Sequence, residues 1–431
     1  MGNYGISLFD LKNIQKKYGR TLNCIRRLSP CGRVNVANAL DLSWTAADNH
    51  LRDLSQNGFL QDEGKKLYKL IPEIAYCAGI AVGTRSIKVS ILDFNFDPIK
   101  AENVAEFELK NLEQQKDGNE MLFCYQSSQN LDVLTDRLNQ ILQILLDAFE
   151  TNGRKLFAVT LAFPGAVDVQ QQKIIACPNI GCLAGKSIPA LLRDTLLKRM
   201  KKNGVTLLVD NNSKTALIAE REHLFRSQDA ERRKLAGAPN IAVVYGATGL
   251  GCGLSMEYRL QRGTRFAGEL GHLTAPDYQT ENSICKDTKP VSCSCTNENC
   301  LEQMIRTRVF GANSLSAFLE ATSEEKLRCF ERKHPAEYKV FLQYTGYIIN
   351  HLINLLDLDA LIFTGRLFEH MENFADHLNM LKGKYTLSYT GESCSVLLGW
   401  QRADIAAIGA AMEGFLTNGE SDCTIQWQKS I

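Results

Sequence analysis

One histidine and three cysteines constrain this 431-residue chain more than any other feature. The stretch that begins at Gly268 reads GELGH, which contains His272, and continues to Cys293, Cys295 and Cys300 in the spacing C-x-C-x4-C. Four nitrogen and sulfur ligands are what a closed, tetrahedral structural zinc site requires, and such a site shapes a loop without activating water. Ordinary reduced thiols and a disulfide are the alternatives. Three cysteines within eight residues favour zinc.

Two carboxylates flank this stretch, because Glu269 precedes the histidine and Glu302 follows the last cysteine. A metal that closes the loop would bring the two carboxylates close together. Carboxylates beside a histidine are suited to hydrogen bonding with the hydroxyls of a polyol. The sequence therefore predicts a sugar pocket that includes Glu269, His272 and Glu302.

The pattern E-x-G-H followed by C-x-C-x4-C-x-E resembles the signature of the ROK family, which comprises bacterial sugar kinases and sugar-responsive repressors of the same fold. The metal ligands and both glutamates fall in register, whereas Thr296 and Asn299 stand where the family usually carries glycines. The resemblance covers roughly residues 8–415 and implies an α/β fold with two actin-like, ribonuclease H-like lobes. It also implies a homodimer or a homotetramer.

The composition describes a globular protein. Hydrophobic residues make up 45% and charged residues 23% of the chain, and the net charge is +1. The N-terminal segment lacks the apolar run of a signal peptide, and no stretch reaches transmembrane length. The fourteen cysteines are scattered outside the one cluster. We therefore expect a cytoplasmic protein with reduced thiols and no membrane partner.

Residues 1–72 are predicted to form a winged helix-turn-helix domain. Apolar residues recur at helical spacing over residues 10–28, and a second short helix is expected over residues 34–40. Ser43 is placed to cap a third helix that ends at the Asn57-Gly58 signal. Three helices with a short turn before the third are typical of a helix-turn-helix.

The charge of this segment supports a nucleic-acid partner. The first 70 residues hold eleven Lys and Arg against six Asp and Glu, a net charge of +5, so the remainder carries −4. Two short apolar pairs bracket the polar segment DEGKK, as strands of a wing would. A three-helix bundle for protein contacts is the alternative. The residues expected to contact double-stranded operator DNA are Arg33, Ser43, Trp44, Thr45, Asn49, Arg52, Lys65 and Lys66.

The resemblance also shows which kinase residues are missing. The family opens its first lobe with D-x-G-x-T, whose aspartate organises the magnesium and phosphates of ATP, and this chain has Ala81 at that position. A buried strand ends in Asp210, Asn211 and Asn212, and Asn212 stands where the family has its general base. An amide hydrogen-bonds a hydroxyl but accepts no proton near neutral pH. We therefore expect no kinase activity, and we expect Asn211 and Asn212 to bind sugar.

Two further segments resemble the family and remain open to two interpretations. Asn179, in the loop that leads to the sugar pocket, either contacts the ligand or holds the turn after Pro178. The glycine-rich stretch VVYGATGLGCGL either cradles phosphate or serves tight backbone geometry.

Three domains follow from this interpretation. They are the DNA-binding domain over residues 1–72, a first lobe over 73–206 completed by a helix over 404–420, and a second lobe over 207–403 with the zinc loop and the sugar pocket. The expected function is that of a sugar-responsive transcriptional regulator from the repressor branch of the family, with a sugar or sugar phosphate as effector. The alternatives are an active ATP-dependent sugar kinase with an added DNA-binding domain, and a DNA-binding protein whose sugar pocket serves only dimerisation.

Overall fold

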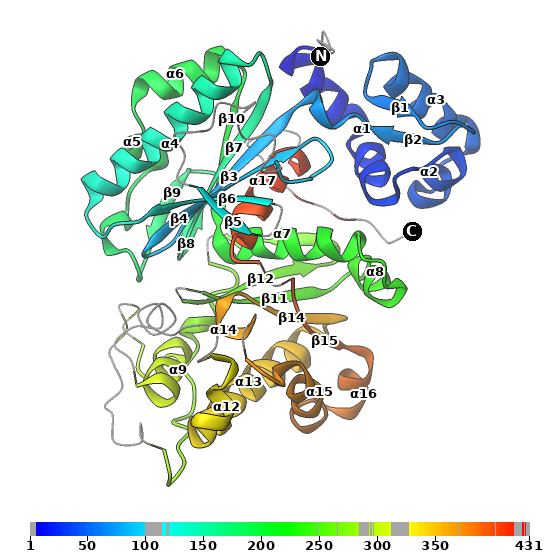
Figure 1. The fold of residues 1–431 in the computed structure, drawn as a ribbon. Coiled ribbons are helices and arrows are strands. Elements are labelled where there is room, and N and C mark those ends of the chain that lie inside the picture. The colour runs from blue at the N-terminus through cyan, green and yellow to red at the C-terminus, as the bar shows by residue number, and fades with distance from the viewer. Residues whose placement is uncertain are drawn as a thin grey trace.

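The computed structural model shows a small N-terminal domain beside two larger α/β lobes (Figure 1). Among the described residues, no helix is both long enough and apolar enough to cross a bilayer. The structure describes residues 6–99, 114–117, 120–247, 249–264, 266–283, 293, 295, 297–311, 327–369, 371–400, 402–417, 425 and 427.

The N-terminal domain has the three helices and the two-stranded wing that the sequence predicts. Its elements are α1 (Leu8–Leu28), α2 (Arg33–Leu40), α3 (Trp44–Gln56) and the antiparallel strands β1 (Leu60–Asp62) and β2 (Tyr68–Leu70). The hydroxyl of Ser43 accepts a hydrogen bond from the backbone N–H of Ala46 at 3.1 Å, so Ser43 caps α3 as expected. Asp41 ends α2 in the left-handed conformation, with φ 53°, which forms the predicted turn.

The first lobe is built on a six-stranded mixed sheet in the order β10-β7-β3-β4-β6-β5, so this lobe extends past the boundary that we expected at residue 206. Strands β10, β7 and β3 are parallel, and β3, β4, β6 and β5 pair in antiparallel fashion, starting with the β3–β4 hairpin. The strands are β3 (Tyr76–Val82), β4 (Ser86–Asp93), β5 (Gln114–Asp117), β6 (Glu120–Gln126), β7 (Leu156–Phe163) and β10 (Thr206–Asn211). A small hairpin, β8 (Ala166–Asp168) and β9 (Lys173–Ala176), follows β7.

Helices cover both faces of this first sheet. Ala78, Ile80 and Val82 of β3 pack in one cluster with α4 (Leu131–Thr151), whereas Ala81 packs with alanines of α17 (Ile405–Leu416) on the other face. Strand residues alternate between the two faces of a sheet, which is why neighbours in β3 contact different helices. The remaining helices of this lobe are η1 (Pro72–Ile74), η4 (Gly181–Leu183), α5 (Ile188–Leu191) and α6 (Asp194–Lys202).

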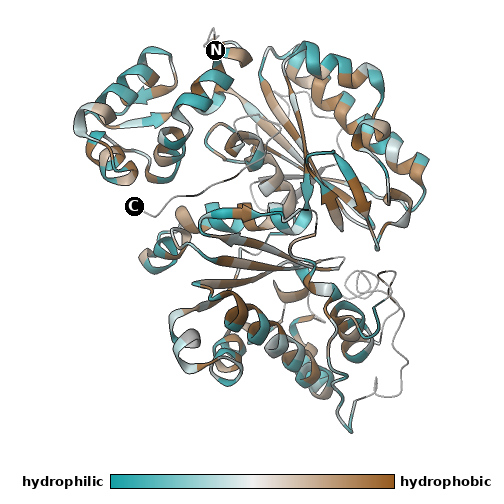
Figure 2. Ribbon diagram, turned by 180° about the vertical axis from the view of Figure 1, so that it is seen from behind, coloured by the Kyte–Doolittle hydropathy of each residue, from teal (hydrophilic) through white to brown (hydrophobic). Residues whose placement is uncertain are grey.

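The second lobe is built on a five-stranded sheet in the order β13-β12-β11-β14-β15. Its strands are β11 (Ile241–Gly246), β12 (Leu250–Met256), β13 (Arg259–Gln261), β14 (Ala360–Thr364) and β15 (Ser395–Leu398). Its outer helices are η5 (Leu270–His272), α9 (Leu301–Phe310), α12 (Phe330–Lys333), α13 (Pro335–Leu356), α14 (Arg366–Glu369), α15 (Phe374–Tyr385) and α16 (Ser388–Ser393). The strands and the inner helix faces are apolar, and the outer helix faces are polar (Figure 2).

Helix α7 (Asn212–Phe225) lies between the two sheets, with α8 (Ala230–Ala236) after it (Figure 1). Apart from His223, every residue of α7 is buried. The small residues of α17 allow close packing against α7, because a Cβ on Gly409 would overlap the backbone carbonyl of Thr215. The final helix was expected over residues 404–420, and residues 418–420 lie outside the described part of the chain.

The N-terminal domain is packed against the first lobe through α1. Leu22 and Ile25 of α1 belong to the same buried cluster as Phe415 of α17. Arg26 is buried beside aromatic rings and donates from Nε to the carbonyl oxygen of Phe94 at 2.7 Å. Burial lowers the pKa of Arg26 to about 9. The contact between α1 and the first lobe is therefore buried and largely apolar.

Candidate metal centre and polar pocket

The predicted histidine and cysteines come together. The ligand atoms of His272, Cys293, Cys295 and Cys300 all lie within 4.8 Å of one another. Nδ1 of His272 is 3.6 Å from the sulfur of Cys293. Tetrahedral zinc with its usual bond lengths separates its ligand atoms by about 3.5–3.8 Å, so the donor set and the distance between His272 and Cys293 fit zinc. The three cysteines are not joined by disulfides.

Local backbone geometry positions these ligands. His272 ends η5, and Cys300 is the residue that precedes α9. The two segments are held together by backbone hydrogen bonds, among them Leu301 N–H to Leu273 at 2.8 Å. Asn299, at one position where the family usually has glycine, has φ 53°, a conformation that asparagine tolerates better than most residues. Thr296, at the other, lies outside the described residues.

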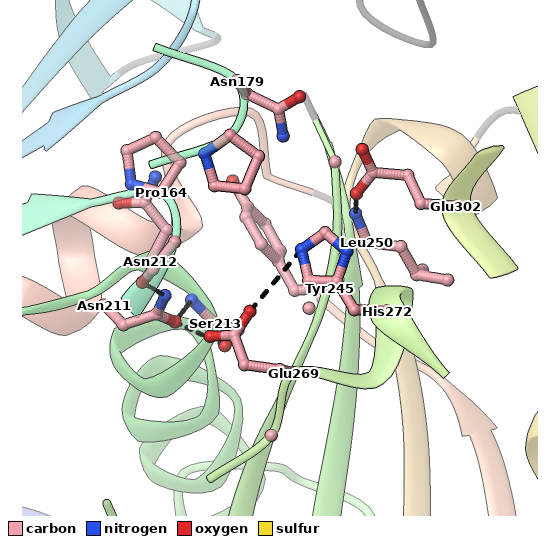
Figure 3. A pocket seen from close by; sticks show the side chains of 15 residues that line it. Pro164, Asn179, Asn211, Asn212, Ser213, Tyr245, Leu250, Glu269, His272 and Glu302 are labelled. Atoms are coloured by element: carbon pink, nitrogen blue, oxygen red, sulfur yellow. Dashed lines mark hydrogen bonds and ion pairs between the residues drawn. The ribbon is translucent and has the colours of Figure 1, made fainter. Parts of the chain in front are cut away.

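His272 faces two sites at once. Its Nδ1 points to the cysteine cluster, and its Nε2 lies 3.9 Å from a carboxylate oxygen of Glu269 (Figure 3). A metal on Nδ1 would leave the proton on Nε2, because the neutral ring carries one proton. The metal site would therefore fix His272 as a hydrogen-bond donor toward the pocket.

A polar pocket between the lobes is lined by all five predicted sugar-binding residues. These are Asn211, Asn212, Glu269, His272 and Glu302 (Figure 3). Asn179, Ser213 and Tyr245 also line it, and only Asn179 of these was considered from the sequence. Parallel strands end at this edge, where α/β folds commonly bind ligands.

Asn211 and Asn212 differ in which hydrogen-bonding atoms of the side-chain amide are available to a ligand. Asn211 donates to the carbonyl oxygen of Gly165 at 2.5 Å and accepts from the backbone and the hydroxyl of Ser213, so its amide holds the start of α7. Asn212 donates to the carbonyl oxygen of Val82 at 2.9 Å. Its Oδ1 is buried and has no hydrogen-bond partner among the described residues. Asn212 therefore offers an acceptor to a ligand.

Glu302 of the second lobe and Asn179 of the first lobe approach each other at this pocket. The Glu302 carboxylate accepts a hydrogen bond from the backbone N–H of Leu250 at 2.8 Å. Burial raises the pKa of both Glu302 and Glu269. The volume of the polar pocket is about 50 Å³.

The glycine-rich stretch is explained by close packing. A Cβ on Gly249 would lie 2.6 Å from both Asn179 and Glu302, and one on Gly253 would lie 2.5 Å from the carbonyl oxygen of Ser213. A Cβ on Gly246 would contact Leu367. These glycines serve tight backbone geometry, which is one of the two interpretations of the sequence.

The two lobes are also connected by buried ion pairs. The sequence does not predict these pairs. Arg262, which follows β13, donates to Asp210 of β10 at 2.6 Å and to Glu413 of α17 at 2.7 Å. Both carboxylates are fully buried. Because these three residues lie far apart in the chain, no local pattern could have paired them.

The predicted DNA-contacting residues are exposed on the N-terminal domain. Arg33 stacks on Trp44 at 5.4 Å, and Arg52 donates to Asn49 at 2.7 Å on the surface of α3. Lys65 and Lys66 follow Gly64 at the tip of the wing. Arg33, Thr45, Lys65 and Lys66 are all exposed, as a DNA-binding face requires. Ser43 is exposed as well, with its hydroxyl engaged in the helix cap.

The family model described as ROK family matches residues 114–413. The chain belongs to the ROK family. No curated protein matches it. Among solved structures, a ROK family transcriptional regulator, a homologue of the E. coli MLC protein, has 17% identity and a TM-score of 0.62, with 95% of this chain and 98% of that chain covered.

ROK kinases match a smaller part of the chain. A glucokinase from Streptomyces griseus, in complex with glucose and AMPPNP, has 18% identity and a TM-score of 0.54, with 78% of this chain and 98% of that chain covered. A hexokinase from Thermus thermophilus has 19% identity and a TM-score of 0.50, with 78% and 97% covered. At these identities the likeness establishes the ROK fold alone.

Proposed function

We propose that this protein is a DNA-binding transcriptional regulator, a repressor, whose ROK lobes sense a sugar or sugar phosphate without phosphorylating it. The proposal rests on the contacts at the two ends of helix α7. Its first residue, Asn212, lines the polar pocket. In its last turn, Glu222 accepts hydrogen bonds from Arg27 of α1 in the N-terminal domain. One buried helix thus connects the pocket with the domain that carries the predicted DNA contacts.

The far end of α7 is held from several sides. The Arg27 guanidinium lies over the ring of Phe225 at 3.9 Å and pairs with Glu222, whose side chain is 1% exposed. Trp427 donates from its indole N–H to Glu222 at 3.0 Å. Rigid helices held by buried polar contacts transmit small displacements, since such a contact is either made or broken.

Sugar binding supplies the displacement in this proposal. A sugar that binds between residues of the two lobes, such as Asn212 and Glu269, favours one spacing of the lobes over the other. Its hydroxyls donate to Oδ1 of Asn212 and to Glu269, and accept from Nε2 of His272. Because the ligand binds the two closure states with different affinity, it changes their populations and hence the spacing of the DNA-binding domains in a dimer or tetramer.

The zinc contributes structure in this account. His272, Cys293, Cys295 and Cys300 would hold it, and a site of four protein ligands leaves no position for a reactive water. The metal fixes the loop that carries His272 and the start of α9, where Glu302 lies.

Two substitutions support sensing without phosphoryl transfer. Ala81, at the family's phosphate-organising carboxylate, is 7% exposed and packed among alanines such as Ala162 and Ala407. Asn212, at the position of the family's general base, hydrogen-bonds the backbone instead. Loss of a general base alone costs about 10²- to 10⁴-fold in rate.

The experiment uses the full-length protein to select sequences from a random DNA library and then measures affinity for the selected duplex with and without hexoses and their phosphates. Selective DNA binding that a sugar alters supports the proposal. Binding that is independent of sequence would contradict the regulator role. Steady ADP production from Mg-ATP with any sugar would favour the kinase instead.

A further inference from the structure

A second cavity adjoins the polar pocket and is lined mainly by apolar groups. Its volume is about 330 Å³. Ile175, Ala176 and Pro178 of the first lobe line one side, and Phe266 of the second lobe lines another. Glu269, His272 and Pro178 line both this cavity and the polar pocket. A ligand held by Glu269 and His272 can therefore extend into it.

The lining of this second cavity favours an apolar group over a free hexose as its occupant. Each buried hydroxyl without a hydrogen-bond partner costs about 1–3 kcal/mol. The wall formed by Ile175, Ala176 and Phe266 offers only apolar side chains, and the polar side chains Glu269 and His272 stand at the border with the other pocket. An apolar group would gain from burial here, whereas a ring with hydroxyls on every side would lose.

The exposure of Phe266 also indicates an apolar group in the second cavity. Its side chain is 47% exposed, which makes it one of the few large exposed apolar residues of the described chain. An exposed apolar side chain beside a polar pocket is a feature of ligand-binding surfaces. An apolar group in the cavity would cover this ring.

We propose that the effector is a sugar with a bulky apolar substituent, an alkyl or aryl group, whose hydroxyls bind in the polar pocket and whose substituent fills the second cavity. This inference rests on the proposed sugar-sensing function and specifies its ligand. The cavity volume of about 330 Å³ leaves room for a substituent larger than a methyl or acetyl group.

The test compares matched ligands on the full-length protein. Glucose, galactose and mannose are titrated beside their methyl, butyl and phenyl glycosides and beside 2-acetamido and 2-butanamido derivatives, with dissociation constants from calorimetry. In either the alkyl glycosides or the 2-acylamido derivatives of one sugar, each added methylene should lower the dissociation constant by about fourfold. The phenyl glycoside should bind more tightly than the methyl glycoside.

Two variants assign the effect to the cavity. Ala184, an exposed residue of its wall, changed to Leu should weaken binding of the substituted sugar by about tenfold and leave the free hexose unchanged. Phe266→Ala should reduce the preference for the substituted sugar in the same way. Ala230→Leu, at an exposed position of α8 outside this cavity, is the matched control and should change neither affinity.

The outcomes separate this inference from the function on which it rests. Free hexoses that bind tightly and are weakened by every substituent would overturn the inference and leave the sugar sensor intact. A preference for substituted sugars that Ala184→Leu and Phe266→Ala do not alter would also overturn it. Absence of binding by every sugar would overturn both.

Discussion

Arg27 of the N-terminal domain and Glu222 of α7 form a two-point ion pair although they lie 195 positions apart in the chain. Their side chains are 10% and 1% exposed. Exposed ion pairs contribute little to the free energy of folding. Removal of one partner of a buried pair is costly, because it leaves an uncompensated charge in the protein interior. This pair is therefore a vulnerable link between the N-terminal domain and the lobes.

Substitution of Arg27 by Met should uncouple the two parts. Met retains part of the packing on Phe225 but leaves Glu222 with Trp427 as its remaining donor, and we expect a loss of about 3–5 kcal/mol in unfolding free energy. Sugar affinity should stay within about twofold, and the change in DNA affinity on sugar binding should shrink. Calorimetry measures the sugar affinity, and titration with DNA in the presence and absence of sugar measures the change in DNA affinity.

Arg20→Met is the control, since Arg20 is exposed on the same helix. If Arg20→Met and Arg27→Met reduced the sugar response equally, the ion pair would not be the route of coupling.

Cys293→Ser should remove bound zinc. The substitution takes away one of four ligands, so the metal content should fall from about one equivalent to near zero. Because the metal holds His272 and the segment before Glu302, sugar affinity should fall as well. Atomic emission gives the metal content. Cys329→Ser, a cysteine outside the cluster, should retain zinc, and an unchanged zinc content in Cys293→Ser would show that the cluster is not the metal site.

Asn212→Leu should weaken sugar binding. Leucine has nearly the same size but lacks the free acceptor Oδ1 and the hydrogen bond to Val82. One hydrogen bond contributes about 1 kcal/mol, so we expect a five- to tenfold rise in the dissociation constant. Unaltered affinity would mean that the ligand does not use this amide.

Asp93 should make stability depend on pH. Burial raises its pKa to about 7, whereas an aspartate in the unfolded chain has a pKa of about 3.9. Between these values the native state binds more protons, so stability should fall as pH rises from about 4 to 7 and then level off. Asp93→Asn should remove this slope and be more stable at pH 8, by up to about 4 kcal/mol.

The amide oxygen that Asp93→Asn introduces can still accept the backbone hydrogen bonds of Asn95 and Asp97. Asp62→Asn is the matched control, because Asp62 is an exposed aspartate that accepts from Gly64 in a similar turn. Urea unfolding at pH 5 and pH 8 gives the free energy of unfolding of the two variants and of the unaltered protein. Equal stabilisation of both variants at both pH values would contradict the role of Asp93.

Much of this architecture could be predicted because its signals are local. The Ser43 N-cap, the short turn before α3 and the two strands of the wing each depend on a few neighbouring residues. The metal ligands were predictable too, since three of the four lie within eight residues.

The contacts that connect the parts were not predictable from the sequence. Glu222 meets Arg27, and Arg262 meets Asp210, only because the two sheets stack around α7. The same holds for Asn211, which was expected to bind sugar through its amide. The structure places it in the pocket wall, but that amide is already engaged with Gly165 and Ser213.

The most direct test of the regulator account is the affinity of the full-length protein for its selected DNA duplex as a function of the concentration of a sugar shown to bind it. The account predicts a change of about 5- to 150-fold that saturates with sugar occupancy, which is the usual range of allosteric coupling. A sugar that binds with saturation and leaves DNA affinity unchanged would contradict it.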